Sequence, residues 1–441
     1  MSRPNPAAVV LAAGLGTRMH SATPKHFHPL LGRRMVDWVV EAARAVGADP
    51  LVVVASPEGA SAFDGIEVAV QAEPRGTGDA LRVAREALDG VEGDLLVLIG
   101  DAPTLSPELL RELLETHRRE EAAATVLSFS PADRRDYGRV IRDENGAVRE
   151  IVEAGDATPE QLAVDEVNSA IYVFAADRIW PALDQLDTAN RQGELYLTDA
   201  VRHLVENGER VAAYVAPHPA EAEGVNTRAE LAEAAAALRD RINEAHMLAK
   251  VTIVDPKTTW IEADVELEPD STIHPFTVLS GHTKVGAGAV VGPHAVAVDA
   301  VIGPEATVGP FCYLRPGTVL EARAKAGTFV EIKNSHIGEG AKVPHLSYIG
   351  DADVGEGTNV GAGGITANYR PELGPGKFRT EIGRNVHTGV HNVFVAPITV
   401  GDNAWIAAGS VVTKNVPPGS LAIARSKQVN KEGFDDRDRD A

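Results

Sequence analysis

In the second half of the chain, aliphatic residues recur six positions apart in several runs, between which the phase resets, and this period restricts the fold more than any other feature. A period of six fits neither an α-helix nor a twisted sheet. It is typical of a parallel β-helix, in which each hexad supplies one short strand with its aliphatic side chain inward. We therefore expect residues 250–441 to form a parallel β-helix. The predicted inward residues are Leu267, Ile273, Leu279, Val285, Val291, Ile302, Val308, Leu314, Leu320, Ile337, Val343, Ile349, Val354, Val360, Ile382, Thr388, Phe394, Val400, Ile406 and Val412.

Residues 1–226 follow a different pattern, in which short apolar runs alternate with longer helical stretches. This alternation predicts an α/β domain with a Rossmann-like, mostly parallel sheet flanked by helices. In such sheets ligands bind beyond the carboxyl ends of the strands. The predicted strands are 7–13, 50–55, 94–99, 124–128 and 170–174, and the predicted helices include 35–46, 78–88 and 107–121.

Residues 227–249 contain neither Gly nor Pro and are rich in Ala, Leu, Glu and Arg. This composition predicts one long helix that connects the two halves as an arm. A disordered linker is the alternative, but it would need more Gly, Pro or Ser. The expected domains are therefore 1–226 and 250–441, with 227–249 as a helical linker.

Net charge and cysteine content narrow the function. The 441 residues carry a net charge of −21, which makes nucleic acid or an anionic membrane an improbable main partner. The one cysteine, Cys312, excludes intramolecular disulfides and cysteine-cluster metal sites, and it suits a reducing cytosol. No apolar run approaches the ~20 residues of a membrane span, and the N-terminus shows no secretory signal, so we expect a soluble, cytoplasmic protein.

A turn of small residues, 11–19, directly follows the first predicted strand. Its backbone could approach a ligand closely and donate N–H groups to phosphate, although a simple tight turn needs the same residues. Arg18 and Lys25 add two cations near this turn in an acidic chain. Together they suggest a clamp for a triphosphate, whereas a lone lysine would more often be a solvated surface residue.

The segment from Leu11 to Met19, LAAGLGTRM, followed by Pro24 and Lys25, resembles the signature of sugar-nucleotide pyrophosphorylases. Joined to a hexapeptide-repeat half, it resembles the GlmU family, whose members are N-acetylglucosamine-1-phosphate uridyltransferases and glucosamine-1-phosphate N-acetyltransferases. The resemblance implies a left-handed β-helix, a homotrimer with acetyl sites between subunits, and a role in peptidoglycan precursor synthesis. It also implies UTP, glucosamine 1-phosphate and acetyl-CoA as substrates, and Mg²⁺ as cofactor.

For uridyl transfer the resemblance implies catalytic roles for Arg18 and Lys25 and magnesium binding by Asp101 and Asn226. Asp101 ends an apolar strand, where a carboxylate is costly unless it serves a ligand, although a helix cap is the alternative. The nucleophilic phosphate is already ionised, so the protein must mainly neutralise charge and align the reactants. The resemblance implies that UTP and the sugar nucleotide contact Leu11, Ala12, Ala13, Gly14, Lys25, Gln71, Gly76, Thr77, Gly138, Glu153, Asn168 and Asn226.

In the repeat half, four polar residues recur at separations near the roughly 18 residues of a three-hexad coil, so they can stack in one region. They are Arg315, Lys333, His345 and Tyr348. The resemblance implies that His345 is the general base, because imidazole titrates near working pH. It implies a sugar-phosphate clamp of Arg315, Lys333, Tyr348 and Asn359, and acetyl-CoA contacts at Ala362, Asn368, Tyr369, Ala408 and Arg425.

Three positions depart from the family pattern. Ile99 stands where relatives often have Tyr, residues 370–376 lengthen one segment, and Val390-His391 replaces the usual Ser-Asp. The last two departures fall on the acyl-donor side. A nucleotidyltransferase for another sugar 1-phosphate, with an altered acetyl site, therefore stays open as an alternative. A non-catalytic regulatory subunit is a further alternative, disfavoured by Arg18, Lys25, Asp101, Asn226 and His345.

Overall fold

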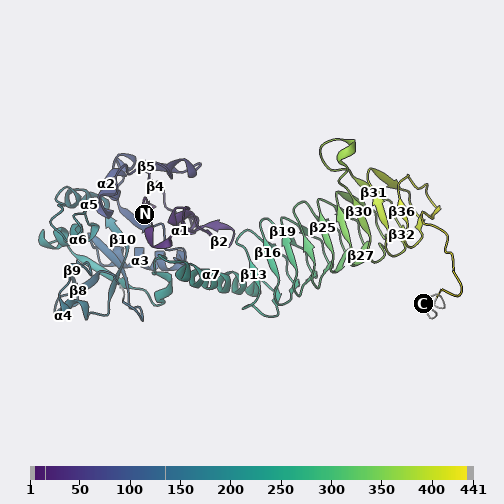
Figure 1. The fold of residues 1–441 in the computed structure, drawn as a ribbon. Helices are drawn as coiled ribbons and strands as arrows, with labels where there is room; N and C mark the ends of the chain where they lie inside the picture. The colour runs from purple at the N-terminus through teal and green to yellow at the C-terminus, as the bar shows by residue number, and fades with distance from the viewer. Residues whose placement is uncertain (1–4, 15, 135, 435–441) are drawn as a thin grey trace, which may run out of the picture. The chain divides into compact units, whose positions relative to one another are not determined.

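The computed structural model describes residues 5–14, 16–134 and 136–434. The chain divides into two compact units, Met1–Leu238 and Arg239–Ala441, which are drawn in Figure 1 and described separately below. Among the residues so described, no helix combines the length and the apolarity needed to cross a membrane.

A mixed sheet forms the centre of the first unit, with strand order β11-β7-β10-β6-β1-β4-β5. The predicted parallel sheet is confirmed for β1, β4, β5 and β6, whereas β10 runs antiparallel to both β6 and β7. A hairpin of β8 and β9 pairs beside β10. The strands are β1 (Ala7–Ala12), β4 (Leu51–Ala55), β5 (Glu67–Val70), β6 (Asp94–Ile99), β7 (Ala124–Phe129), β8 (Arg139–Arg142), β9 (Val148–Val152), β10 (Val167–Ala175) and β11 (Val211–Val215).

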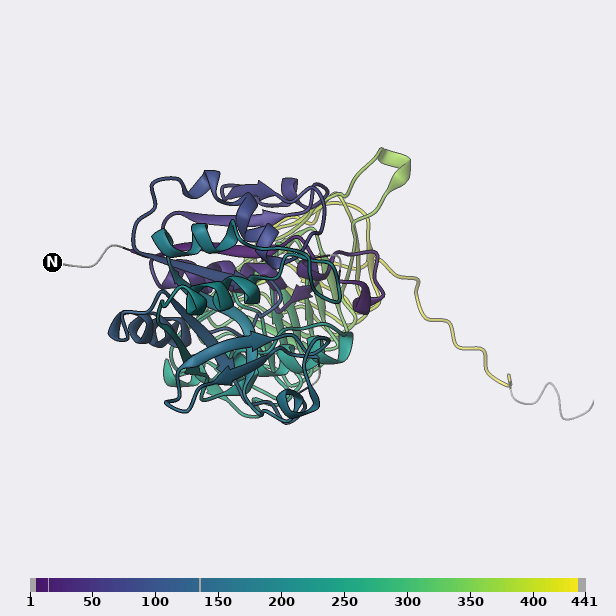
Figure 2. The same cartoon turned by 90° about the vertical axis from the view of Figure 1, so that its left-hand side faces the viewer.

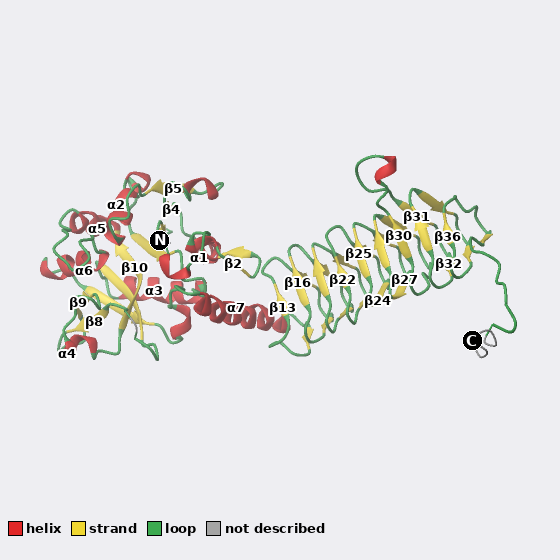
Figure 3. Cartoon of the chain, in the orientation of Figure 1, coloured by secondary structure: helices red, strands yellow, loops and turns green. Residues whose placement is uncertain are grey.

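Helices cover both faces of this sheet, as Figure 3 shows in red. Alternate residues of a strand point to opposite faces, so Val9 packs into one apolar cluster and Val10 into the other. The cluster around Val9 includes α2 (Thr77–Val83), α5 (Ala176–Leu183) and α6 (Leu197–Glu206). The cluster around Val10 includes α1 (Met35–Ala45) and α3 (Pro107–Arg119). With both faces covered, the carboxyl ends of the strands are left to form a site.

The helix expected over 227–249 is α7 (Arg228–Leu248), and it does more than connect the units. In the first unit, Ala234 and Leu238 are buried in a cluster with Met35. In the second unit, Nδ2 of Asn243 donates to the carbonyl oxygens of Pro256 at 2.9 Å and Thr259 at 3.0 Å. The predicted helix is therefore more than a connecting arm, because its first half packs into a core of the first unit and its second half packs against the core of the second.

The second unit is a parallel β-helix whose strands stack on three faces, and Figure 3 draws it almost wholly as strands and loops. The first face holds β12 (Thr252–Ile253), β15 (Thr272–Ile273), β18 (Val290–Val291), β21 (Thr307–Val308), β24 (Lys325–Thr328), β27 (Lys342–His345), β32 (His387–Thr388), β35 (Trp405–Ile406) and β37 (Leu421–Ala422). The second face holds β13 (Trp260–Ile261), β16 (Val278–Ser280), β19 (Val296–Val298), β22 (Tyr313–Leu314), β25 (Glu331–Lys333), β28 (Tyr348–Gly350), β30 (Ile365–Ala367), β33 (Val393–Val395) and β36 (Val411–Val412). The third face holds β14 (Glu266–Leu267), β17 (Lys284–Val285), β20 (Val301–Ile302), β23 (Val319–Leu320), β26 (His336–Ile337), β29 (Ala352–Val354), β31 (Thr380–Ile382) and β34 (Ile398–Val400).

The six-residue period is confirmed as the inward column of this β-helix. Its members are buried, apart from Leu267, which is partly buried against the same core. Successive coils pair in register, as Ile273 with Val291 and Val308 with Ala326. The left-handed β-helix expected from the repeat and the family resemblance is thereby confirmed as the fold class.

An exposed stack of side chains follows the corner between the first and second faces. We call Phe276, His294, Phe311, Phe329 and Leu346 the corner ladder. All five adopt positive φ, between 48° and 59°. Ring centroids of successive members lie 4.7, 4.8 and 5.3 Å apart from Phe276 to Phe329, and the backbone N of Leu346 donates to Thr328 O in the coil before it. The ladder leaves four large apolar side chains about half exposed.

Candidate active sites

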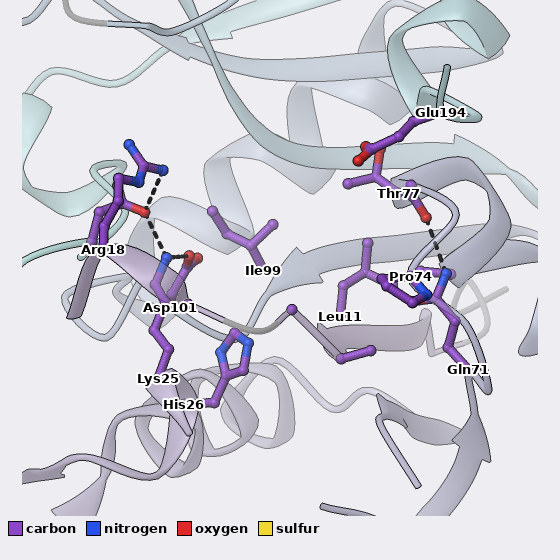
Figure 4. A pocket seen from close by; sticks show the side chains of 16 residues that line it. Leu11, Arg18, Lys25, His26, Gln71, Pro74, Thr77, Ile99, Asp101 and Glu194 are labelled. Atoms are coloured by element: carbon purple, nitrogen blue, oxygen red, sulfur yellow. Dashed lines mark hydrogen bonds and ion pairs between the residues drawn. The ribbon is translucent and has the colours of Figure 1, made fainter. Parts of the chain in front are cut away.

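A cavity of about 480 Å³ lies at the carboxyl ends of β1, β5 and β6, where the α/β pattern predicts a ligand. Figure 4 shows charged side chains at one end and Gln71 with Thr77 at the other. The lining residues are Leu11, Ala13, Gly14, Gly16, Arg18, Lys25, His26, Gln71, Pro74, Gly76, Thr77, Ala80, Ile99, Asp101, Glu194 and Asn226. Most nucleotide contacts expected from the sequence thus line one cavity. Ala12 instead is buried in β1, and Leu15 of the same turn lies outside the described residues.

The charged end joins two cations to two oxygen-bearing side chains. Lys25, which is buried, forms an ion pair with Asp101 and donates to Asn226 Oδ1 at 2.6 Å. Arg18 Nη2 donates to the same oxygen at 3.0 Å. Three parts of the chain therefore meet here: the turn after β1, the end of β6 and the start of α7. Arg18 and Asn226, which share a hydrogen bond, are more than 200 positions apart in the sequence.

Asp101 is ionised at this end of the cavity. Burial alone would raise the pKa of its carboxyl group, but the charge of Lys25 and the hydrogen bond from Lys25 offset burial and help to hold the pKa below its usual value. Its Oδ1 atom is buried and has no hydrogen-bond partner among the residues that the structure describes. An unsatisfied carboxylate oxygen beside an amide oxygen fits Mg²⁺, which prefers oxygen ligands and completes its shell with substrate phosphates and water. In the same described part, no three His, Cys, Asp or Glu side chains form a metal-binding group, so an ion here would depend on substrate oxygens.

The N-terminal cap of α7 holds Asn226 in place. Glu230 Oε2 accepts hydrogen bonds from the backbone N atoms of Asn226 at 2.6 Å and Thr227 at 3.3 Å. Thr227 Oγ1 in turn accepts from the backbone N of Glu230 at 3.2 Å. This reciprocal arrangement is a capping box, a pattern that fixes where a helix begins. The helix start therefore positions a residue of the cavity, a role that the sequence analysis missed.

The opposite end of the cavity is built around Gln71. Its Nε2 atom donates to Gly76 O at 3.2 Å and to Asp79 Oδ2 at 3.0 Å, which ties the segment after β5 to the start of α2. Gly76 has φ of +111°, and a Cβ there would lie 2.6 Å from Leu195 O, so the position requires glycine. Thr77 Oγ1 accepts from Leu197 N at 3.1 Å. The hydrogen bond at Leu197 thus attaches the segment after Glu194, a residue that lines the cavity, to the start of α2.

Gly138, Glu153 and Asn168 form a second cluster, outside the lining of this cavity. Asn168 N donates to Gly138 O at 2.9 Å, and Thr198 Oγ1 donates to Glu153 Oε1 at 3.2 Å. Burial raises the pKa of the Glu153 carboxyl. A Cβ on Gly138 would lie 3.4 Å from Glu153 Oε2, so the two residues are neighbours. The structure therefore groups the three expected sugar contacts with one another.

His26 and Glu194 also line the cavity, and sequence reasoning did not single them out. The His26 ring lies against the backbone at Gly14 and Gly100, and burial lowers its pKa. Its position beside Lys25 was the available signal. Ile99, noted as a departure from the family, lines the cavity as well.

In the β-helix, His345 and three of the residues expected to contact acetyl-CoA follow one column at the corner that also carries the ladder. These three residues are Ala362, Ala408 and Arg425. His345 ends β27, directly before Leu346. Further along this corner, His391 N donates to Ala362 O at 2.7 Å and Gly409 N donates to Val390 O at 2.8 Å. A Cβ on Gly409 would lie 3.7 Å from Arg425 Cδ, so Ala408 and Arg425 follow in the same column. Val390 is about half exposed, which places this departure on the open surface of the column.

The expected sugar-phosphate residues lie on the second face and at its far corner. Lys333 pairs with Gly350, and Arg315 forms an ion pair with Glu331 at 2.8 Å. Asn368 Nδ2 donates to Tyr348 Oη at 3.3 Å. Within one chain, the length of strand β28 thus separates most of the expected sugar-phosphate residues from His345.

Two other expected residues, Asn359 and Tyr369, lie apart from these two groups. Asn359 bridges Lys342 and His387, at the opposite end of the first face from His345. Tyr369 is exposed, and Lys377 Nζ lies 4.2 Å from its ring centre. This pair closes the base of the longer 370–376 segment, which contains the short turn Pro371–Leu373 and projects from the β-helix in Figures 1 and 2.

Comparisons with known proteins agree with this architecture. Residues 8–250 match the MobA-like NTP transferase domain family. A protein of Streptomyces avermitilis named "Bifunctional protein GlmU" is 48% identical, and the match covers 100% of this chain and 96% of that protein. Proteins of the same name from Kineococcus radiotolerans and Brevibacillus brevis are 48% and 44% identical, with 97% and 96% of this chain and 91% and 96% of those proteins covered.

Proposed function

The chain belongs to the GlmU family of bifunctional enzymes, and on that premise we propose that its two units catalyse successive steps of UDP-N-acetylglucosamine synthesis. The β-helix unit transfers an acetyl group from acetyl-CoA to glucosamine 1-phosphate. The first unit then joins the product to UMP from UTP and releases pyrophosphate. The convergence of Lys25, Asp101, Asn226 and Arg18 in one cavity is the observation that carries this proposal.

For uridyl transfer, a phosphate oxygen of N-acetylglucosamine 1-phosphate attacks the α-phosphorus of UTP, and the bond to pyrophosphate breaks. Both reactants are anions, so the protein must offset their repulsion and hold them in line. Arg18 and Lys25 supply the positive charge, and triphosphate oxygens would replace Asn226 and Asp101 as their partners. The enclosed end at Gln71 and Thr77 would hold the base, and Gly138, Glu153 and Asn168 the sugar.

Magnesium would be held by Asp101 and Asn226, and it supplies charge neutralisation for the transferring phosphate when bound. The buried, unsatisfied Oδ1 of Asp101 supports this assignment.

For acetyl transfer, the sugar amine attacks the thioester carbonyl, loses a proton to His345, and coenzyme A leaves as the thiol. His345 is exposed at the corner, so its ring is open to a substrate. Arg315, Lys333, Tyr348 and Asn359 would bind the sugar phosphate. Ala362, Asn368, Tyr369, Ala408 and Arg425 would contact acetyl-CoA.

We further propose that the enzyme is a cytoplasmic homotrimer with each acetyl site shared between subunits. Two features support sharing. The corner ladder is a row of apolar side chains left exposed in one chain, and such rows are typical of association surfaces. It continues along the same corner into the column of His345, Ala362, Ala408 and Arg425.

Two single variants of the full chain test both activities at once. Asp101→Asn should lower uridyl transfer at least a hundredfold, because it removes the proposed metal ligand and the partner of Lys25, and should leave acetyl transfer unchanged. His345→Ala should lower acetyl transfer by roughly 10²–10⁴-fold and leave uridyl transfer unchanged. Acetyl transfer is assayed with glucosamine 1-phosphate and acetyl-CoA. Uridyl transfer is assayed with a panel of sugar 1-phosphates, UTP and Mg²⁺. A wild-type chain that prefers another sugar 1-phosphate, or that cannot acetylate, would contradict the proposal.

A further inference from the structure

A buried carboxylate, Asp351, lies at the corner that follows β28, among residues proposed above to bind substrates. Only about 7% of Asp351 is exposed, and its backbone has positive φ of 50°. Its two carboxylate oxygens accept from two different amides, Asn334 Nδ2 at 2.7 Å on Oδ1 and Asn368 Nδ2 at 2.6 Å on Oδ2. Hydrogen bonds to a carboxylate are stronger than those between neutral groups, so the carboxylate fixes how both amides are turned.

The Asp351 contact determines which atom Asn368 presents to a ligand. Because Nδ2 of Asn368 faces Asp351, and also lies 3.3 Å from Tyr348 Oη, the amide plane is held with Oδ1 on its other side. An amide that was free to rotate could present either its donor or its acceptor. With Asp351 present, Asn368 offers an acceptor for an N–H group of the ligand.

Gly350 makes this arrangement possible. A Cβ on Gly350 would collide with Tyr348 Oη and would lie 2.6 Å from Asn368 Nδ2. The Tyr348 ring thus reaches past Gly350 from the start of β28 to the corner that follows it. Asp351 N also donates to Lys333 O at 3.0 Å, which ties the coil of Lys333 to the same corner.

We propose that Asp351 is a positioning residue for acetyl transfer, which orients the Asn368 amide so that its oxygen accepts a hydrogen bond from the acyl donor, acetyl-CoA. This inference rests on the proposed function of the β-helix unit. The alternative is that Asp351 merely stabilises a left-handed corner, as Asp299 does three coils earlier at the same corner by accepting from His282 N at 2.9 Å. The second amide, Asn334, separates these two roles, because it shares the carboxylate but lies in the preceding coil.

The test compares Asp351→Asn with Asn334→Ala in the full-length chain. Thermal melting is the control for folding of the β-helix unit, because uridyl transfer takes place in the other unit. Asp351→Asn keeps the volume but leaves one acceptor oxygen for two amides, so the orientation of the Asn368 amide is no longer fixed. We expect the KM for acetyl-CoA to rise about tenfold, with kcat and the KM for glucosamine 1-phosphate changed less than threefold. Asn334→Ala removes the other hydrogen bond of the corner and should leave the KM for acetyl-CoA unchanged.

Equal rises in KM for the two variants would overturn the proposal in favour of a structural role, as would melting of Asp351→Asn at the assay temperature. Calorimetric titration with acetyl-CoA gives a second reading that needs no turnover. A tenfold weaker Kd in Asp351→Asn alone supports the proposal, and equal Kd values in all three proteins overturn it. If the wild-type chain does not bind acetyl-CoA, both this inference and the proposed acetyl transfer fail. If it binds but does not acetylate glucosamine 1-phosphate, only the proposed reaction fails.

Discussion

Single residues in this molecule show how burial changes the chemistry of a charged group. Asp101 and Glu153 are both carboxylates withdrawn from water in the first unit, but their pKa values move in opposite directions. Lys25 beside Asp101 offsets its burial, whereas Glu153 has a hydroxyl donor, Thr198, and further acidic groups nearby. Asp101 is therefore suited to bind cations, whereas ionising Glu153 costs free energy.

Glu153→Gln should make the first unit more stable at neutral and alkaline pH. Burial raises the pKa of Glu153 in the folded state above its unfolded value, so wild-type stability falls as pH rises through the folded pKa. Glutamine has no proton to lose and can still accept from Thr198 through Oε1. We expect melting curves to show a higher Tm for the variant at pH 8 and a smaller difference at pH 4.

The same substitution should lower uridyl transfer about tenfold, because Glu153 is a proposed sugar contact. Glu144→Gln, which changes an exposed carboxylate in the same unit, serves as the matched control and should alter neither quantity. A Glu153→Gln protein that melts below wild type at pH 8 would show that the ionised carboxylate has a partner that outweighs its burial.

At the scale of elements, local patterns in the sequence predict strands and helices well where burial decides them. β6 lies at 94–99 as expected, because the five apolar residues after Asp94 form a short run between turn signals, and such a short run favours a buried strand. The inward column of the β-helix is equally predictable, because each coil repeats the same environment. The antiparallel direction of β10 was missed, because strand direction depends on the connection and not on composition.

The candidate sites were predictable only in part, for a related reason. Lys25 belongs to a recognisable sequence motif beside a turn, and Asp101 to one at the end of a strand. The structure brings these two residues into contact. Glu230 contacts Asn226 and Thr227, and Asp351 contacts Asn334 and Asn368. The roles of Glu230 and Asp351 depend on these contacts, and no local sequence pattern indicates such roles. Asn359 and His345 both fit family motifs, but stacking along the coils separates them in one chain.

The packing of helix α7 determines which N-terminal fragment of the chain should fold by itself. A fragment of residues 1–226 would lose Leu238, which is fully buried, and Glu230, which caps Asn226. Loss of the leucine alone removes about 1.5–3 kcal/mol of burial. We expect a fragment of residues 1–238 to fold and to form UDP-sugar, and a fragment of residues 1–226 to melt lower and to react more slowly.

Thermal melting and UDP-N-acetylglucosamine formation measure the two fragments. Full-length Glu230→Ala separates the contributions, since it removes the side chain that caps the helix and leaves the apolar contacts in place. Equal melting and equal rates for the two fragments would show that the first half of α7 adds nothing to the unit.

For the whole molecule, the corner ladder predicts that acetyl transfer depends on association. Phe311→Glu adds a charge to a ring that is about half exposed in one chain, so the monomer should fold normally. In a subunit interface the same charge would be buried without a partner, and the assembly should dissociate. We expect a lower mass by light scattering, acetyl transfer reduced at least tenfold, and uridyl transfer unchanged.

Val301→Glu is the matched control, because Val301 is similarly exposed but lies in β20 on the third face. It should change neither mass nor activity. An assembly that is unaffected by Phe311→Glu would remove the ladder from the proposed interface.

The asymmetric ends of the β-helix have a consequence for how the enzyme fails. In a solenoid each coil is stabilised mainly by its neighbours, so melting starts as fraying at whichever end is less protected. The end near residue 251 is covered by α7, where Asn243 is fully buried, whereas residues 423–434 after the last strand are exposed. The coils that carry Ala408 and Arg425 should therefore unfold first. Under mild heat stress the acetylating activity should fade while nucleotidyl transfer persists, so that one polypeptide changes from a two-step catalyst into a one-step catalyst before it denatures.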